Sequence, residues 1–94
     1  MKLGVIGLGR MGGNIARRLM NDGHDVMVFD RDADAIAKSV AHGAIAATGL
    51  SDMHGWLGAS AIFWLMLPAG KPTEDVVEAL ADIAKPGDTI IDGG

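Results

Sequence analysis

Short apolar runs alternate along the chain with longer segments in which apolar residues recur every three or four positions. The runs show little polar alternation, which is typical of strands buried on both faces of a parallel sheet. They predict strands at residues 2–6, 26–29, 44–47, 61–67 and 89–91, of which 44–47 is the weakest.

Helices are predicted between these strands from apolar residues that fall on one helical face. The predicted inner faces are Met11, Ile15, Ala16, Leu19 and Met20, then Ala33, Ile36, Ala37, Val40 and Ala41, and finally Val76, Val77, Leu80, Ala81 and Ala84. A shorter helix over residues 51–57 is a poor one because it contains Gly55. Gly23 and Gly43 are expected to end the first two helices, while Ser51 and Thr73 are expected to cap the last two.

The order of elements is therefore β-α-β-α-β-α-β-α-β within one small domain. Such alternation with short loops predicts a parallel sheet with helices on both faces. Right-handed crossovers favour the strand order 3-2-1-4-5, so we expect a Rossmann-like, doubly wound α/β fold.

Composition and charge narrow the classes of function. The net charge of -4 gives no basic footprint for nucleic acid, and the absence of cysteine excludes disulfides and thiolate metal sites. The three histidines of the chain have no spacing that suits a metal, so no metal site is expected. Glycines interrupt the first apolar run, and no run approaches the roughly 20 residues that a membrane span needs. We expect a cytoplasmic protein with no membrane partner.

A glycine motif joins the first strand to the first helix. Gly7, Gly9 and Gly12 satisfy GxGxxG in this strand–turn–helix context. Gly7 would permit the tight turn, Gly9 would let the backbone approach a pyrophosphate, and Gly12 would let the helix pack closely. The amides at the helix N-terminus would then bind the phosphates of a dinucleotide. The alternative is a glycine-rich turn that binds nothing.

Asp30 ends the second strand, 18 positions after Gly12. A carboxylate there can accept hydrogen bonds from both hydroxyls of the adenosine ribose. A 2′-phosphate at about 4 Å from it would be repelled by roughly 1–4 kcal/mol. This favours NAD over NADP, although the guanidinium of Arg31 could pair with a 2′-phosphate. Asp30 could instead, or in addition, cap the second helix.

A further binding segment is predicted after the fourth strand, where Leu67, Pro68, Ala69 and Gly70 follow. Strands one and four flank the switch point of this topology, and ligands bind beyond their carboxyl ends. Small residues there leave room for a flat ring. The alternative is a simple turn.

Three segments together resemble the decarboxylating 6-phosphogluconate dehydrogenases, particularly their NAD-preferring bacterial branch. They are GLGRMGGNIARRLMNDGHDVMVFDRD, WLMLPAG and GDTIIDGG. The resemblance implies a coenzyme site made of Gly7, Leu8, Gly9, Arg10, Met11, Gly12, Asp30, Arg31, Asp32, Leu67, Pro68 and Ala69. NADP-using members carry asparagine where Asp30 stands, and many carry lysine where Pro68 stands, so NADP is the less expected coenzyme.

The resemblance also implies a reaction, the oxidation and decarboxylation of 6-phosphogluconate to ribulose 5-phosphate. The family's substrate loop, lysine base, glutamate acid and helical domain have no counterpart in these 94 residues. We therefore expect a truncated coenzyme domain, residues 1–94, with no catalytic residue and no turnover by itself. An exposed strand edge or interdomain face would then favour self-association.

Two other functions stay open at this point. The related 3-hydroxyisobutyrate and tartronate semialdehyde dehydrogenases share the first segment, although they more often carry serine or threonine where Gly93 and Gly94 stand. The other is a stand-alone nucleotide-sensing module without catalysis. The residues that would bind a sugar phosphate are not among these 94.

Overall fold

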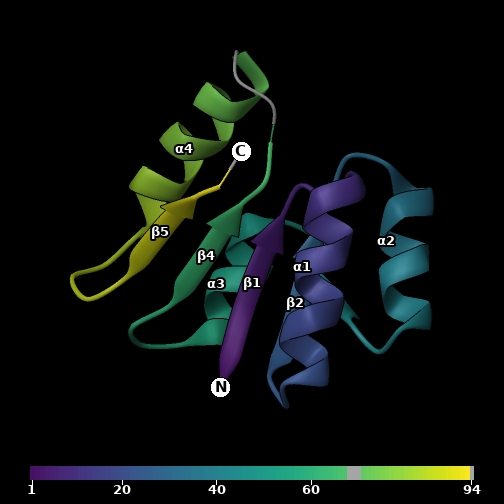
Figure 1. Ribbon diagram of the computed structural model, residues 1–94. Coiled ribbons are helices and arrows are strands. Elements are labelled where there is room, and N and C mark those ends of the chain that lie inside the picture. Colours follow the sequence, from purple (N-terminus) through teal and green to yellow (C-terminus); the bar gives the residue numbers. More distant parts are fainter. Residues whose placement is uncertain (68–70, 94) are drawn as a thin grey trace.

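The fold is a five-stranded parallel sheet with two helices on each face (Figure 1), described for residues 1–67 and 71–93 in this computed structural model. The strands are β1 (Lys2–Ile6), β2 (Asp25–Phe29), β3 (Ile45–Ala46), β4 (Ile62–Leu65) and β5 (Thr89–Asp92). The helices are α1 (Arg10–Asn21), α2 (Ala33–Ala41), α3 (Leu50–Leu57) and α4 (Lys71–Ile83). The strand order is β3-β2-β1-β4-β5, which confirms the predicted doubly wound topology.

Strand β1 lies at the centre of the sheet and sets the register of its neighbours. Its last residue, Ile6, pairs with Phe29 of β2 and with Leu65 of β4. Since all these pairings are parallel, the carboxyl ends of the three strands lie at one edge of the sheet. We call this the carboxyl edge, and the loops that follow the three strands meet there.

The two faces of the sheet bury separate hydrophobic clusters because side chains of a strand alternate between its faces. Val5 of β1 packs on the side of α1 and α2, with Ala16 of α1 among its neighbours. Ile6 packs on the other side, with Met53 of α3 and Leu80 of α4. Both sides of the central strand are thus covered, as its continuous apolar sequence predicted.

The inner face of α2 differs from the prediction. Val40, expected to face the core, is 44% exposed, and Ser39 next to it is buried at 5% exposure. Ile36 packs against the core as predicted, and Ala35, which was not predicted, packs there as well. The helix carries more small apolar residues than its contact can cover, so spacing alone did not identify the buried stripe.

Two predicted N-caps are also wrong. Helix α3 begins at Leu50 after Gly49, so Ser51 lies inside its first turn; the nearby Asp52 accepts a hydrogen bond from the N–H of Thr48 at 3.0 Å. Helix α4 begins at Lys71, which places the backbone of Thr73 within the helix. By contrast, α1 and α2 end just before Gly23 and Gly43, as expected.

A carboxylate organises the opposite edge of the sheet, the amino edge, where β4 and β5 begin. Asp88 accepts hydrogen bonds from the backbone N–H groups of Ala61 and Lys85, each at 2.9 Å. His54 Nε2 of α3 lies 2.8 Å from Asp88 Oδ2, and its ring stacks on Phe63 with centroids 5.9 Å apart. The Lys85 N–H, then His54 and the Ala61 N–H, hold the pKa of Asp88 below its ordinary value, although burial opposes them.

Two kinds of feature are absent from the described residues. None of their helices is long and apolar enough to cross a bilayer. Nor do residues 1–67 and 71–93 bring three or more histidine, aspartate or glutamate side chains together as a metal site would.

Candidate functional site

The turn between β1 and α1 requires glycine at its first position. Gly7 has φ +90°, and a Cβ atom there would lie 2.7 Å from the carbonyl oxygen of Met66. A side chain would therefore be strained by conformation and would also collide with backbone. The N–H of Gly7 donates to the carbonyl of Phe29 at 2.9 Å, which ties the turn to the end of β2.

Gly12 and Gly9 lack side chains for two different reasons. A Cβ atom on Gly12 would collide with the carbonyl oxygen of Gly7, so α1 can approach the turn this closely because of that glycine. A Cβ atom on Gly9 would meet nothing within 4 Å, and Gly9 therefore leaves open space above the loop. The first glycine of the motif shapes the turn, the last permits packing, and the middle one borders space that a ligand could fill.

The N-terminus of α1 lies next to this space. The amide of Gly13 bonds to the carbonyls of Leu8 and Gly9, at 2.9 and 3.1 Å. The amides before it belong to the first turn, which has no intrahelical acceptors. The N-cap, Gly9, supplies no side-chain acceptor, and the first turn carries no acidic residue. The positive end of the helix dipole is thus available to an anion.

Asp30 connects this loop to the start of α2. Its Oδ2 atom accepts from the N–H of Leu8 at 2.6 Å, and its Oδ1 atom accepts from the N–H of Asp32 at 2.8 Å. The helix cap is Asp32, which accepts from the N–H of Asp34 at 2.9 Å, so the alternative that Asp30 caps α2 is wrong. A carboxylate has about four acceptor positions, and each oxygen of Asp30 can therefore accept a further hydrogen bond.

A cavity of about 340 Å³ lies at the carboxyl edge, between the ends of β1, β2 and β4. We call it the switch-point cavity. It is lined by Ile6, Gly7, Gly9, Phe29, Asp30, Arg31, Met66, Leu67 and Val76. Five of the residues predicted for the coenzyme site, Gly7, Gly9, Asp30, Arg31 and Leu67, are brought together there.

Other predicted site residues lie elsewhere. The Leu8 side chain is 3% exposed and belongs to the core under α1 and α2, so its backbone N–H is the part that faces Asp30. Met11 is 64% exposed and lines neither this cavity nor the core. Pro68 and Ala69 fall outside the described residues, and so does the side chain of Arg10.

The sequence did not identify the apolar walls of the cavity. Phe29 and Met66 reach it because each is the residue next to a predicted binding segment. Val76 comes from α4, where its spacing indicated a core residue and nothing indicated a ligand. Apolar walls beside a single carboxylate and a guanidinium are the usual composition of a site for a flat, partly charged ligand.

Comparison with known proteins gives a family for this chain. The family model of the NAD binding domain of 6-phosphogluconate dehydrogenase matches residues 2–94. The NAD(+)-dependent, decarboxylating 6-phosphogluconate dehydrogenase of Haloferax volcanii is 39% identical over 94 residues, which are 100% of this chain and 31% of that enzyme. The chain thus spans about a third of the length of such relatives.

Solved structures show the same fold. The 3-hydroxyisobutyrate dehydrogenase of Mycobacterium tuberculosis, determined with L-serine, superimposes with a TM-score of 0.76 at 29% identity over 97% of this chain and 30% of its own. Psf3 in complex with NADP+ and 2-OPP gives a TM-score of 0.78 at 26% identity, over 96% of this chain and 32% of its own. Proteins of this fold therefore include one that was solved with NADP+.

Proposed function

This chain belongs to the family of NAD-binding domains of 6-phosphogluconate dehydrogenase, and we propose that it binds NAD within an enzyme that converts 6-phosphogluconate to ribulose 5-phosphate. Membership in this family makes a dinucleotide its coenzyme. The choice of NAD and the whole reaction are our proposals, since the chain covers 31% of the Haloferax volcanii enzyme.

The observation that carries the choice of NAD is the position of the Asp30 carboxylate. It lines the switch-point cavity and is held by two backbone amides, from Leu8 and Asp32. A fixed carboxylate with spare acceptor positions suits two ribose hydroxyls, whereas a 2′-phosphate would meet its negative charge. Arg31 lines the same cavity, so it offers a counterion that weakens this repulsion without removing it.

The residues at the carboxyl edge fit a dinucleotide. Open space above Gly9 and the first-turn amides of α1 suit a pyrophosphate, because the backbone can approach it without a side chain between. The ribose would lie against Asp30, and the apolar walls formed by Phe29, Leu67 and Val76 would cover its flat base. When bound, the coenzyme's nicotinamide supplies a hydride acceptor. These residues of the chain bind and orient it.

Calorimetric titration with NAD and NADP tests the coenzyme choice. We expect the unchanged chain to bind NAD more tightly, and Asp30→Asn to lower NAD affinity about tenfold, because charged hydrogen bonds are lost. The preference over NADP should shrink in the same variant. Asp34→Asn is the matched control, since Asp34 lies in the first turn of α2 and does not line the cavity. An unchanged preference in Asp30→Asn would contradict the assignment.

The reaction itself is tested on a full-length protein that contains this domain. We expect NADH formation from NAD with 6-phosphogluconate, with release of CO₂ and ribulose 5-phosphate. The second candidate substrate is a 3-hydroxyisobutyrate-type acid, which the fold likeness to the Mycobacterium tuberculosis enzyme supports. Faster turnover of 3-hydroxyisobutyrate than of 6-phosphogluconate would contradict the first assignment and support the second. The 94 residues alone should bind coenzyme weakly and should form no NADH with either.

We further propose that the domain self-associates through β5. This strand is at the end of the sheet, and Ile90 and Ile91 are 38% and 36% exposed on its two sides. An edge strand with apolar side chains favours pairing with another copy. Sedimentation velocity should show a concentration-dependent dimer that Ile91→Lys reduces, and a monomer at all concentrations would contradict this.

As a coenzyme-dependent enzyme domain, the protein is proposed to work in the cytoplasm.

A further inference from the structure

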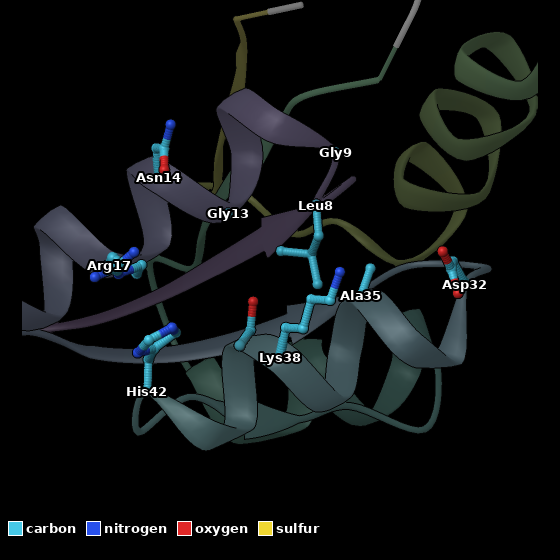
Figure 2. Close-up of a pocket in the computed structure, with 10 residues that line it drawn as sticks. Leu8, Gly9, Gly13, Asn14, Arg17, Asp32, Ala35, Lys38 and His42 are labelled. Atoms are coloured by element: carbon cyan, nitrogen blue, oxygen red, sulfur yellow. The ribbon is translucent and has the colours of Figure 1, made fainter.

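A second hollow lies between α1 and α2, beside the coenzyme loop. This interhelical groove has a volume of about 390 Å³ and is lined by residues of both helices (Figure 2). Its lining residues include Gly9, Arg17, Asp32, Lys38 and His42. Of these, Gly9 alone also lines the switch-point cavity, so the two hollows meet at the loop and diverge from it.

Three basic side chains line the groove. Arg17 comes from α1, Lys38 from α2, and His42 is the C-cap of α2. Within residues 1–67 and 71–93, the structure shows none of these three side chains in an ion pair. The guanidinium of Arg17 and the ammonium of Lys38 are therefore two cations without an ion-pair partner, in a chain whose net charge is -4. Such a cluster between two helices creates a local positive potential.

The negative charge in the groove is confined to its opposite end. Figure 2 shows Arg17 and His42 near each other at one end, Lys38 in the middle, and Asp32 at the end where α2 begins. The Asp32 carboxylate already accepts the N–H of Asp34 at 2.9 Å as the cap of α2. An anion in the groove would therefore be drawn toward Arg17 and away from Asp32.

We propose that the interhelical groove is a binding site for a small phosphate-bearing anion, separate from the coenzyme site. The guanidinium of Arg17 can bind two phosphate oxygens at once, and Lys38 supplies a mobile point charge. His42 adds a donor at the same end. A volume of about 390 Å³ is in the usual range for a small-molecule site. The occupant would be a phosphate monoester or a diphosphate that regulates or accompanies the domain.

Inorganic pyrophosphate is the probe for this site. Nitrogen-15-labelled protein is titrated with it at constant ionic strength, with and without saturating NAD, while the backbone amides are followed by NMR. Saturable shifts are expected at Arg17, Lys38 and His42 in both titrations. The NAD-saturated titration separates the groove from the coenzyme loop, because bound NAD would occupy the amides of residues 9–12.

Charge-removing variants make the assignment specific. Arg17→Gln and Lys38→Gln should each weaken pyrophosphate binding about tenfold, the effect of losing a charged hydrogen bond. Arg18→Gln is the matched control on the same helix, because Arg18 lines a different hollow with Asp22 and Trp64. It should change affinity less than about twofold, as for an exposed charge.

Four results would overturn the proposal. They are an equal loss in Arg18→Gln, shifts confined to residues 9–12, exclusion of pyrophosphate from the groove by NAD, and binding of citrate as tight as that of pyrophosphate. The last would show that the groove does not select phosphate. If NAD fails to bind, the titration without NAD still tests whether pyrophosphate binds in the groove. Failure of the proposed coenzyme function is therefore distinguishable from failure of the groove proposal.

Discussion

The N-termini of α1 and α2 lie on the same side of the sheet and at the same edge, yet only α2 has a side-chain N-cap. The N-cap of helix α2 is Asp32, whose side chain accepts the N–H of Asp34, and Asp34 adds a second carboxylate in the first turn. The N-cap of helix α1 is Gly9, and no acidic residue occupies its first turn. The N-terminus of α2 is capped by its own side chains, whereas the N-terminus of α1 has no side-chain cap and lies beside a cavity.

This difference shows which helix end is built for a ligand. Relative to glycine, a side-chain cap contributes a few tenths of a kcal/mol to helix stability, and α1 lacks it. The same omission leaves the amides and the dipole of α1 available to a phosphate, whereas those of α2 are already used. Asp30 stands between the two ends and bonds to a backbone amide near each of them.

The largest expected effect comes from destroying the close approach of α1 to its loop. Gly12→Ala places a Cβ atom against the carbonyl oxygen of Gly7, so we expect the free energy of unfolding to fall by about 3 kcal/mol. Urea unfolding measures it. The control is Gly55→Ala in α3, where a Cβ atom meets nothing within 4 Å and should stabilise the helix by up to about 1 kcal/mol. Equal behaviour of the two variants would show that the tight approach is not required.

The next effect comes from making the end of α1 resemble that of α2. Gly9→Asp gives α1 a carboxylate cap, which should alter stability by only a few tenths of a kcal/mol relative to glycine. The same carboxylate would repel the pyrophosphate, and NAD affinity should fall about a hundredfold, or 2.7 kcal/mol. Calorimetry measures the affinity, and Gly9→Ala separates added bulk from added charge. Retained NAD binding in Gly9→Asp would disprove the role of this helix end.

A smaller effect comes from opening the end of α2. Asp32→Ala removes the acceptor for the N–H of Asp34 and should cost about 1 kcal/mol in thermal or urea unfolding. Asp32→Asn keeps an acceptor and should stay within a few tenths of a kcal/mol of the original. If both variants lose the same stability, the negative charge rather than the cap is what α2 needs.

The smallest effect concerns a carboxylate far from both helix ends. Because the folded-state pKa of Asp88 is lowered, its stabilising contribution is complete above the ordinary aspartate value of about 3.9 and is lost as pH falls through the folded-state pKa. Unfolding measured between pH 7 and pH 2.5 should therefore show a loss of stability in acid that Asp88→Asn reduces. NAD affinity at pH 7 should be unchanged in this variant. An identical pH profile in both proteins would contradict the prediction.

The fold could be predicted because each pattern that indicates it lies within a short stretch of the sequence. The apolar runs and intervening helices gave the strand order, and the motif of Gly7, Gly9 and Gly12 was placed in its strand–turn–helix context. The three glycines also have distinct steric surroundings in the structure. That the switch-point cavity holds a coenzyme stays a prediction, since it depends on a ligand.

Features that depend on distant residues were not predictable in the same way. Nothing in the local sequence indicated that His54 bonds to Asp88, 34 positions away, or that its ring stacks on Phe63. The buried side of α2 was predicted only in part. Ile36 packs against the core as expected, but Ala35 and the buried Ser39 were not predicted, because the helix carries apolar residues on several faces. Similarly, the interhelical groove could not be predicted from the sequence, because Arg17 and Lys38 line it from two different helices.

The bonded pair of His54 and Asp88 lies at the amino edge, at the far end of the strands from the loop that carries Gly9. Genetic variation should therefore divide into two kinds of phenotype. Alleles that damage the pair would be temperature-sensitive, since they lower the amount of folded protein and leave its selectivity intact. Alleles of Gly9, where a side chain meets nothing within 4 Å, would instead yield abundant folded protein that does not bind the coenzyme at any temperature. Such copies would act dominantly wherever they join normal ones in an oligomer.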